Sequence, residues 1–346
     1  MQPLRLIIDN KIPYIQGHAE RLGEVRYIDG AAITAEDVHD ADALIIRTRT
    51  RCNRELLEGS SVQFVATATI GYDHIDTGFM AEAGIRWTNC PGCNASSVGQ
   101  YVVHSLLLLE EVGHVRLQDC TVGIVGVGHV GRCVDMLVKR LGCRTLLCDP
   151  PRAETEGVEA FVSLESICRE ADVITFHTPL TCEGQHATWH MANDLFFEQL
   201  KKSPVIVNSS RGEVVCTEAL LRAMDSGRVR AAVIDTWENE PHINADLLRK
   251  AFIATPHIAG YSADGKACGT RMALEAVARH FGCPHTFDVQ PPALPADFAY
   301  YDSDPRAPFS PLRLYHPMRD SHALKAAPEQ FEYLRGHYPL RRECYE

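Results

Sequence analysis

The sequence predicts an α/β protein built from two doubly wound parallel-sheet domains, followed by a small C-terminal α+β region. Three observations predict this fold. Short apolar runs alternate with helical patterns, which is typical of βαβ units with parallel strands. Most of these runs end in small or polar residues, as expected where the carboxyl ends of parallel strands bind ligands. The 346 residues are also enough to bury the cores of two domains.

The N-terminal part carries the alternation of a first sheet. Apolar runs predict strands at residues 4–8, 43–46 and 64–66, with helical patterns at 35–42 and 54–58. We expect residues 1–95, joined by a returning helical segment at 266–283, to form one domain.

The middle of the chain predicts a second sheet of about six strands. It opens with a strongly apolar helical pattern at 97–111, with Ser96 as its N-cap, which we expect to be buried between the domains. Strands are predicted at residues 121–125, 145–148, 173–176, 205–208, 232–235 and 252–255, and helices at 129–141, 164–170, 194–200 and 217–226. We expect residues 96–265 to form this second domain.

The last part of the chain has a different character. After a helical pattern at 269–281, residues 284–317 are rich in proline and show no clear periodicity, and a short helical pattern follows at 328–336. We therefore treat residues 284–346 as a separate C-terminal region.

Composition excludes several classes of protein. The 34 Lys and Arg residues against 45 Asp and Glu give a net charge of −11, which argues against binding nucleic acid or an anionic membrane surface. The N-terminus lacks the features of a secretory signal, and no apolar stretch is long enough to span a bilayer. The 13 cysteines have no repeating spacing, which predicts reduced thiols rather than disulfides. We expect a cytoplasmic protein.

A glycine-rich loop follows the first strand of the second domain. Gly126, Gly128 and Gly131 form a G-x-G-x-x-G motif between a predicted strand and a predicted helix, which is the context that dinucleotide binding requires. The helix N-terminus offers backbone N–H groups and a favourable dipole to a pyrophosphate. We predict that the cofactor phosphates bind at this loop, at Gly126, Gly128, His129, Val130 and Gly131.

An acidic residue indicates which dinucleotide binds. Asp149 ends the next predicted strand, at about the distance from the glycines where a carboxylate contacts the adenosine ribose. A carboxylate there repels the 2′-phosphate of NADP and so favours NAD. Arg152 is the counter-argument, because an arginine accommodates that phosphate. A glycine-lined turn without a ligand, with Asp149 capping a helix, is the structural alternative.

Three residues suggest the chemistry. Arg211, Glu240 and His257 each follow a predicted strand of the second sheet, so their side chains share its carboxyl edge. Oxidation of a 2-hydroxy acid needs a fixed cation for the carboxylate, a base that titrates near neutral pH, and an acid that orients the base. We predict these roles for Arg211, His257 and Glu240, in that order. Taken singly, each residue is more often an ion-pair, solvated or loop residue.

Several longer motifs resemble the D-isomer-specific 2-hydroxyacid dehydrogenase family. They are IIDN at residues 7–10, ATATIGYDHID at 66–76, PGCNA at 91–95, TVGIVGVG at 121–128, LLCDPP at 146–151, FHTPL at 176–180 and TPHIAGY at 255–261. The resemblance covers nearly the whole chain. It implies Rossmann-like and flavodoxin-like domains, with residues 1–95 and 266–283 binding substrate and 96–265 binding NAD.

The resemblance also implies roles for individual positions and an assembly. It places Arg211 and Glu240 in the active site, with His257 as the proton donor or acceptor. The positions that match NAD contacts are Asp149, Thr178, Ser209, Ser210, Arg211, Asp235 and Gly260, and those that match substrate contacts are Thr48, Thr69 and Tyr261. It further implies a cytoplasmic homodimer that oxidises a phosphorylated four-carbon 2-hydroxy acid in vitamin B6 biosynthesis.

A phosphorylated substrate needs fixed cations, and Arg47 and Arg49 at the end of a predicted strand are candidates. Thr48 stands where the family usually has serine, which keeps the hydroxyl, and Arg49 replaces an apolar residue. The C-terminal region matches the family poorly at about 285–312, matches it again near 314–343, and is expected to be a shortened dimerisation region.

One motif resembles a different kind of site. Cys90-Pro91-Gly92-Cys93 has the C-x-x-C spacing of redox and zinc sites, but no second pair accompanies it. The Pro-Gly step predicts a turn before the long helix. His186 and His190 are four residues apart with no third ligand near them in sequence, so we expect no metal.

Two alternative functions stay open at this point. The chain could act on phosphoglycerate, glycerate or hydroxypyruvate as a related dehydrogenase. It could also be a non-catalytic NAD-binding module, such as the corepressors that share this fold, because a binding protein can retain the three residues.

Overall fold

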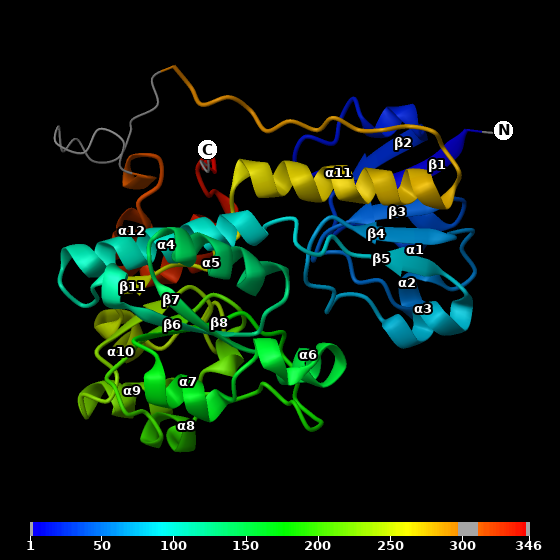
Figure 1. Cartoon of the computed structure of the whole chain (residues 1–346). Coiled ribbons are helices and arrows are strands. Elements are labelled where there is room, and N and C mark those ends of the chain that lie inside the picture. The colour runs from blue at the N-terminus through cyan, green and yellow to red at the C-terminus, as the bar shows by residue number, and fades with distance from the viewer. Residues whose placement is uncertain (1–2, 297–310, 344–346) are drawn as a thin grey trace. The chain divides into compact units, whose positions relative to one another are not determined.

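The computed structural model describes residues 3–296 and 311–343, which fall into two compact units. Unit 1 comprises Met1–Asn94 and Ser262–Ala293, and unit 2 comprises Ala95–Tyr261 and Leu294–Glu346. Each unit is built around one parallel sheet, so the predicted α/β class is confirmed (Figure 1). Part of the predicted C-terminal region, at 297–310 and 344–346, lies outside the described residues.

The sheet of unit 1 has five strands in the order β2-β1-β3-β4-β5, and every neighbouring pair is parallel. The strands are β1 (Leu4–Asp9), β2 (Gly23–Ile28), β3 (Ala43–Ile46), β4 (Phe64–Thr67) and β5 (Arg86–Thr88). The strand order reverses between β1 and β3. In sheets of this kind ligands bind beside the carboxyl ends of the two strands at such a reversal.

Helices cover both faces of this sheet. They are α1 (Ala35–Val38), α2 (Arg54–Leu57), α3 (Thr77–Ala83) and α11 (Ala263–His280), with a 3-10 turn at Ala19–Arg21. The long helix α11 returns from late in the sequence and lies along one face, where Leu274 and Val277 join Ile8 and Ile45 in one core (Figure 1). On the other face, Phe79 packs with the inward side chains of the strands. Unit 1 is therefore incomplete without residues that follow unit 2 in the chain.

The sheet of unit 2 has six parallel strands in the order β11-β10-β9-β8-β6-β7. They are β6 (Thr121–Val125), β7 (Arg144–Cys148), β8 (Val173–Phe176), β9 (Val205–Asn208), β10 (Ala231–Ile234) and β11 (Ile253–Ala254). The order reverses between β6 and β8, directly below the glycine loop. The predicted ligand site therefore lies where the topology expects one.

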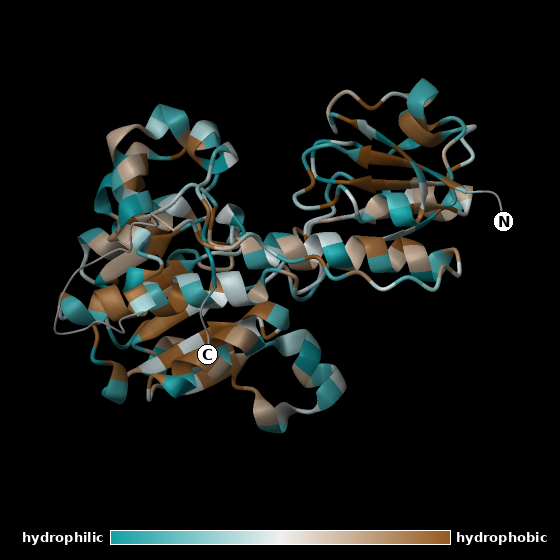
Figure 2. Cartoon of the chain, turned by 90° about the horizontal axis from the view of Figure 1, so that it is seen from above, coloured by the Kyte–Doolittle hydropathy of each residue, from teal (hydrophilic) through white to brown (hydrophobic). Residues whose placement is uncertain are grey.

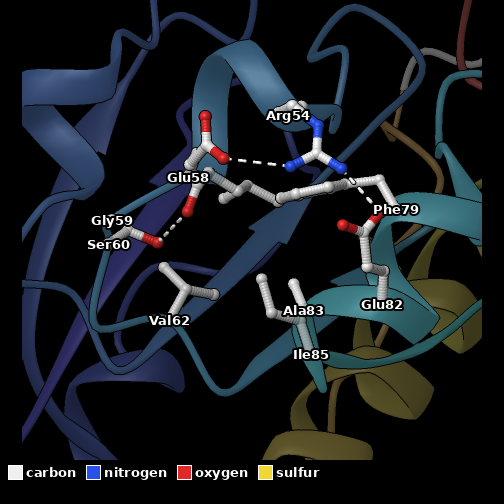
Figure 3. Close-up of a pocket in the computed structure, with 10 residues that line it drawn as sticks. Arg54, Glu58, Gly59, Ser60, Val62, Phe79, Glu82, Ala83 and Ile85 are labelled. Atoms are coloured by element: carbon white, nitrogen blue, oxygen red, sulfur yellow. Dashed lines mark hydrogen bonds and ion pairs between the residues drawn. The ribbon is translucent and has the colours of Figure 1, made fainter.

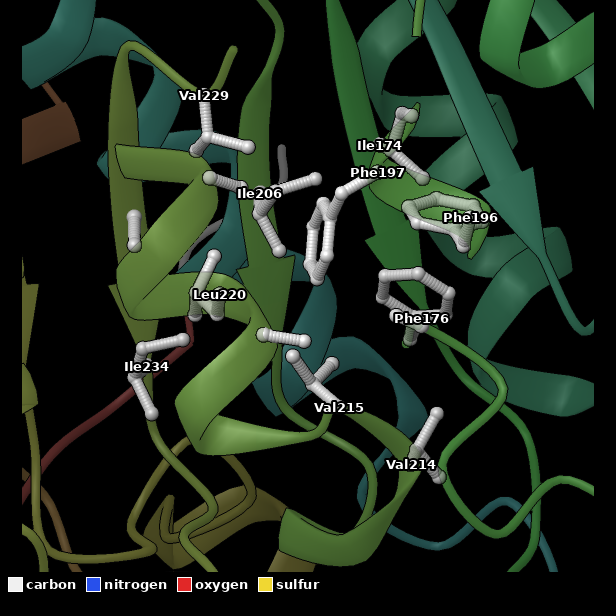
Figure 4. Packing of buried hydrophobic residues seen from close by; sticks show 14 of the residues in the cluster. Ile174, Phe176, Phe196, Phe197, Ile206, Val214, Val215, Leu220, Val229 and Ile234 are labelled. Carbon is white, nitrogen blue, oxygen red and sulfur yellow. The ribbon is translucent and has the colours of Figure 1, made fainter. Parts of the chain in front are cut away.

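Two layers of helices bury this sheet. The helices are α4 (Ala95–Glu111), α5 (His129–Arg140), α6 (Pro150–Glu156), α7 (Leu164–Glu170), α8 (Asp194–Glu198), α9 (Thr217–Asp225) and α10 (Ala245–Lys250), with 3-10 turns at Leu117–Asp119, Val158–Ala160 and Gly212–Val214. On one face Phe176 and Ile206 pack against Phe197 of α8 and Leu220 of α9 (Figure 4). On the other face α4 and α5 form a second core. Figure 2 shows the resulting pattern, with hydrophobic strands inside and hydrophilic residues on the surrounding helices.

Helix α4 is buried in the unit 2 core, and it begins at Ala95, so Ser96 is not its N-cap. Gly99 allows α4 to approach α5 closely, because a Cβ at this position would lie 2.7 Å from Leu137. Among the described residues, no helix is both long and apolar enough to cross a bilayer.

The described end of the chain is helical and packs on unit 2. It contains α12 (Pro317–Ala326), α13 (Phe331–Gly336) and 3-10 turns at Pro311–Arg313 and Pro328–Gln330, and no strand occurs within 311–343. Ser321 of α12 accepts a hydrogen bond from Ala254 N at 3.0 Å and so covers the edge of β11. Leu324 and Phe331 are fully buried in the unit 2 core. The strands expected in an α+β region are thus absent from the described part of this segment.

Candidate active site

The glycine loop has the geometry that a bound pyrophosphate requires. Gly126 turns with φ of 87°, and a Cβ there would lie 2.7 Å from the backbone of His177 on the neighbouring loop. A Cβ at Gly131 would lie 2.1 Å from Gly126 O, so this glycine lets α5 pack against β6. A Cβ at Gly128, in contrast, would meet nothing within 4 Å. The open side of the loop lies at the N-terminus of α5, where His129 and Val130 form the first turn.

Unpartnered polar atoms lie on the loops that follow the neighbouring strands. His177 Nδ1, Thr178 Oγ1 and Ser209 Oγ are buried and have no hydrogen-bond partner among the described residues. They follow β8 and β9, at the carboxyl edge of the sheet. Buried polar atoms normally find partners, so these three fit a site that a polar ligand completes. Burial also lowers the pKa of His177 to about 3, which keeps its ring neutral. The residues present therefore fit NAD.

Asp149 serves the loop as well as its own helix. Its carboxylate accepts from Val127 N at 2.8 Å and caps α6 by accepting from Arg152 N at 3.2 Å. A carboxylate has further acceptor positions, so a ribose contact remains compatible with both bonds. The Arg152 side chain donates to the Val127 carbonyl and pairs with Glu156 at 2.5 Å. Because its guanidinium is engaged in this way, Arg152 gives little support to the NADP alternative.

Glu240 and His257 form a hydrogen-bonded pair. His257 Nδ1 lies 2.8 Å from Glu240 Oε2, and Glu240 Oε1 accepts from Trp237 N at 2.9 Å. Burial opposes ionisation of Glu240, but the bond and charge of His257, the Trp237 N–H and the Arg335 charge lower its pKa overall. An ionised Glu240 fixes the proton of the neutral imidazole on Nδ1 and leaves Nε2 as the basic atom. This arrangement is that of a base and its orienting acid.

Asp235 shapes the backbone that carries His257. Its carboxylate is 1% exposed and accepts from Thr255 Oγ1 at 2.6 Å, Ile258 N at 2.8 Å and Ala259 N at 2.9 Å. His257 itself has φ of 56°, a left-handed conformation that is unfavourable for histidine. The bonds to Asp235 hold the loop in that conformation, and the strain marks the position as functional. Gly260 follows in the same loop.

Arg211 lies on the adjoining loop, after β9. Its guanidinium donates to the Ser210 carbonyl at 2.8 Å, and no ion pair joins it to a carboxylate within residues 3–296 and 311–343. Gly212 allows this loop to lie close to the loop that carries Glu240, because a Cβ at this position would lie 2.0 Å from the Trp237 carbonyl. Ser210 is buried and bonded to Asn208 at 3.0 Å. The loops of the three predicted catalytic residues thus adjoin along one edge of the sheet.

Two of the predicted substrate residues of unit 1 lie near its own strand reversal. Thr48 follows β3 and lines a pocket of about 440 Å³ with Arg49, Arg51, Asp73 and His74. Thr69 Oγ1 lies 2.7 Å from Thr67 Oγ1, which in turn lies 3.1 Å from His74 Nε2. The pocket lining therefore combines the Thr48 hydroxyl group and the His74 ring with two arginines and one carboxylate.

Arg47 has a structural partner that its position in the sequence does not predict. Its Nε donates to Asp9 Oδ2 at 2.9 Å, and Asp9 is fully buried at the end of β1. The guanidinium thus compensates a buried carboxylate, and Arg49 is the residue that lines the pocket. Asp9 is 38 positions earlier in the chain, so the pairing has no local sequence signal.

A second pocket of unit 1 contains none of the predicted residues. It lies beside α2 and α3, where Arg54 donates to Glu58 at 2.9 Å and to Glu82 at 2.5 Å (Figure 3). Its cation is neutralised by these carboxylates, and the pocket is not at the carboxyl edge of the sheet.

Tyr261, the remaining predicted substrate residue, belongs to unit 2. Its hydroxyl accepts from Arg335 Nε at 3.1 Å, and Arg335 comes from the C-terminal helix α13. Sequence reasoning missed Arg335, because no motif for a ligand or catalytic site surrounds it.

The motifs that resemble other sites have structural roles. Cys90 Sγ contacts the carbonyls of Thr67 and Gly269, burial raises its pKa, and Gly92 turns with φ of 80°. His186 pairs with Glu154 and His190 with Glu238, so the two histidines do not share a ligand. Within the described ranges, no three His, Cys, Asp or Glu side chains are arranged to hold a metal ion.

Similarity to known proteins decides the family. Residues 107–259 match the family model described as the D-isomer specific 2-hydroxyacid dehydrogenase, NAD binding domain. A Bacteroides thetaiotaomicron protein named erythronate-4-phosphate dehydrogenase is 52% identical over 341 residues, covering 98% of this chain and 97% of the relative. The chain belongs to the erythronate-4-phosphate dehydrogenase family. A Porphyromonas gingivalis member of this family is 40% identical over 345 residues, covering 98% of this chain and 94% of the relative.

Solved structures support the fold of this erythronate-4-phosphate dehydrogenase family member. The NAD⁺-bound 3-phosphoglycerate dehydrogenase of Entamoeba histolytica matches with a TM-score of 0.68 and 24% identity, over 81% of this chain and 95% of that one. The D-lactate dehydrogenase of Aquifex aeolicus, complexed with NAD and lactic acid, matches with a TM-score of 0.65 and 23% identity, over 81% and 96%. The family resemblance that the motifs indicate is confirmed. The prediction that the cofactor is NAD is also confirmed.

Proposed function

We propose that this chain oxidises 4-phospho-D-erythronate to (R)-3-hydroxy-2-oxo-4-phosphooxybutanoate with NAD, a step of pyridoxal 5′-phosphate biosynthesis. The observation that carries the proposal is the Glu240–His257 pair, 2.8 Å apart, at the edge of the sheet that bears the dinucleotide loop. The choice of substrate rests on the Bacteroides relatives named erythronate-4-phosphate dehydrogenase, which are 52% identical over almost the whole chain.

His257 acts as the base in this proposal. Its Nδ1 is held by Glu240, so Nε2 takes the proton of the substrate 2-hydroxyl group. The ionised Glu240 stabilises the imidazolium that forms. Bound NAD would supply the acceptor for the C2 hydride, so that loss of the hydride and of the hydroxyl proton gives the 2-oxo acid. In the reverse direction His257 returns the proton to the oxygen.

Arg211 binds the substrate carboxylate and polarises the reacting oxygen. A guanidinium is suited to this role because its planar fork bonds two oxygens and stays charged at every working pH. An arginine has five N–H groups, so the bond of Arg211 to the Ser210 carbonyl leaves the others available to the substrate carboxylate.

The phosphate binds in the cationic pocket of unit 1. Thr48, Arg49 and Arg51 line it, which matches the needs of a phosphate better than those of an uncharged sugar acid. Arg49 is therefore the residue that we propose for phosphate selectivity.

We further propose a cytoplasmic homodimer. The assembly comes from the family resemblance, and light scattering of the purified protein measures it directly: a mass near twice 38.4 kDa supports the dimer, and a mass near 38.4 kDa contradicts it.

The decisive experiment is NADH formation by purified protein with four acids: 4-phospho-D-erythronate, D-erythronate, 3-phospho-D-glycerate and D-glycerate. We expect kcat/KM to be at least about a hundredfold higher for 4-phospho-D-erythronate than for D-erythronate, because a lost charge-assisted phosphate contact costs about 3 kcal/mol. Preference for a three-carbon acid would make the chain a related dehydrogenase. NAD binding without turnover of any acid would make it a binding module.

A further inference from the structure

The C-terminal segment places a cation against the site. Arg335, in the last turn of α13, donates from Nε to Tyr261 Oη at 3.1 Å, and its guanidinium lies 5.9 Å from the centre of the same ring. Phe331 in the first turn of α13 is 1% exposed and anchors the helix in the unit 2 core, with Leu334 packed against that core. The core packing of its own helix therefore fixes the position of Arg335.

The charges around Arg335 connect it with the catalytic pair. Burial lowers its pKa, but Tyr261, Glu240 and Glu332 raise it overall. Glu332 is its neighbour on the helix at 3.9 Å, a long distance for an ion pair. The influence is mutual, because the positive charge of Arg335 helps to lower the pKa of Glu240.

We propose that Arg335 is a positioning residue for the proposed oxidation, which fixes the Tyr261 phenol and keeps a permanent positive charge beside the Glu240–His257 pair. The inference rests on the proposed function, in which Tyr261 contacts substrate and the pair moves the proton. It gives a named residue of the C-terminal segment a part in the active site, in addition to the dimerisation that the resemblance implies for this region.

The two effects of Arg335 have separate physical signatures. The hydrogen bond orients Tyr261 and strengthens it as a donor, so its loss affects substrate binding. The charge acts on the pair, and removing a nearby positive charge raises the pKa of any titrating group. The groups that face Glu240 are His257, the Trp237 N–H and Arg335, and those that face Arg335 are Tyr261, Glu240 and Glu332.

Three variants separate these effects. Arg335→Met removes charge and bond, and we expect the acid limb of the kcat/KM–pH profile to move up by about one pH unit. Arg335→Lys keeps the charge but loses the directed Nε–H. We therefore expect the acid limb of the pH profile to stay at its wild-type pH, while KM for 4-phospho-D-erythronate rises about tenfold. Tyr261→Phe removes the same bond from the other side and gives a similar rise in KM, also with the limb unmoved.

Arg222→Met is the matched control. Arg222 is an exposed arginine of unit 2 that pairs with Asp194, so its loss leaves both KM and the pH limb unchanged. The proposal is overturned if the acid limb of the pH profile moves equally in Arg335→Met and Arg335→Lys. It is also overturned if Arg335→Lys keeps the wild-type KM. Should Arg335→Met fail to fold, the KM values of Arg335→Lys and Tyr261→Phe decide alone.

A titration that needs no turnover distinguishes this inference from the proposed function. In protein with ¹³C-labelled glutamate, NMR follows the Glu240 carboxyl group, with its signal assigned by comparison with Glu240→Gln. Because the Arg335 charge helps to lower the pKa of Glu240, Arg335→Met raises this pKa relative to wild type. If the wild-type protein oxidises none of the four acids, the proposed function fails, while an unshifted Glu240 titration refutes the role of Arg335.

Discussion

His257 is the residue on which the proposed chemistry depends most directly. Its backbone is held in a left-handed conformation by the buried Asp235 loop, and its ring is held by Glu240. Two separate sets of bonds thus fix one imidazole, which is what a preorganised base requires. Sequence position alone predicted the pair, because both residues follow adjacent strands of one parallel sheet.

Replacing His257 with glutamine tests the base. We expect kcat to fall by roughly a thousandfold, since general-base catalysis contributes factors of about 10²–10⁴, with NAD affinity unchanged. Turnover is measured as NADH absorbance and NAD binding by calorimetry. Near-normal turnover would remove His257 from the mechanism, and a parallel loss of NAD binding would point to a structural role.

Arg47 shows where residue-level prediction from sequence ends. A cation at the end of a strand suggests a phosphate ligand, but the structure pairs it with Asp9 from another strand. The sequence gives the position of each residue along its strand, and only the order of the strands brings the two side chains together.

Arg47→Ala is therefore expected to affect stability. It leaves the buried Asp9 carboxylate without its cation, and we expect the free energy of unfolding in urea to fall by about 2–3 kcal/mol. The double variant Asp9→Asn/Arg47→Ala removes the unpaired charge and should recover part of this loss. Equal destabilisation of the single and double variants would show that the pair is not coupled.

At the scale of elements, the glycines of the dinucleotide loop have different roles at different positions. Gly131 and Gly128 are three residues apart, yet a Cβ would clash at the first and meet open space at the second. The motif therefore predicts two different consequences of the same substitution.

Gly131→Ala should lower the free energy of unfolding by about 2–3 kcal/mol, because the methyl group would force α5 away from β6. Gly128→Ala should unfold like the wild type but bind NAD at least about tenfold more weakly, because its methyl group enters the path of the pyrophosphate. Urea denaturation and calorimetry measure both variants. An unchanged NAD affinity in Gly128→Ala would place the phosphates elsewhere.

Buried strands were predictable and edge strands were not. The apolar runs at β3, β6, β8 and β9 are buried on both faces, so the sequence pattern gives their bounds almost residue by residue. The prediction has no strand at β2 or β5, because these edge strands expose alternate or most residues and lack a continuous apolar run. Helices α6 and α10 were missed for a related reason, since each is short and mainly polar.

At the scale of the whole molecule, the C-terminal segment is the part that sequence reasoning described least well. Besides Leu324 and Phe331, which are buried in the unit 2 core, its contacts are made by single polar side chains to distant segments. Arg341, for example, is 3% exposed and donates to Gln100 Oε1 at 2.7 Å and to Ile258 O at 3.2 Å. Such contacts have no periodicity, so the sequence could predict the dinucleotide loop and the catalytic pair but not this support behind them.

Asp320 makes the attachment of this segment depend on pH. It accepts from Tyr338 Oη at 2.8 Å and Tyr315 Oη at 3.2 Å, and burial raises its pKa to about 6. Because the folded pKa lies above the unfolded value, this group makes the folded state less stable as pH rises from about 4 to 6, and its contribution is constant above that range.

Asp320→Asn removes this dependence. The free energy of unfolding of the wild type, relative to the variant, should fall by up to about 3 kcal/mol between pH 4 and 7. Urea denaturation of both proteins at several pH values gives the difference. Parallel curves across this range would mean that the Asp320 carboxyl keeps an ordinary pKa.

The discontinuity of unit 1 has a consequence for biosynthesis. Its five strands all precede residue 95, but the helix that covers one of their faces, α11, spans Ala263–His280. At ribosomal rates of about 5–20 residues per second, the ribosome needs roughly 10–40 s to make the intervening chain. For that interval the nascent sheet presents Ile8 and Ile45 to solvent without their partner helix, so a newly made chain is most vulnerable to aggregation before translation ends. A circular permutant that places α11 directly after β5 would close this interval.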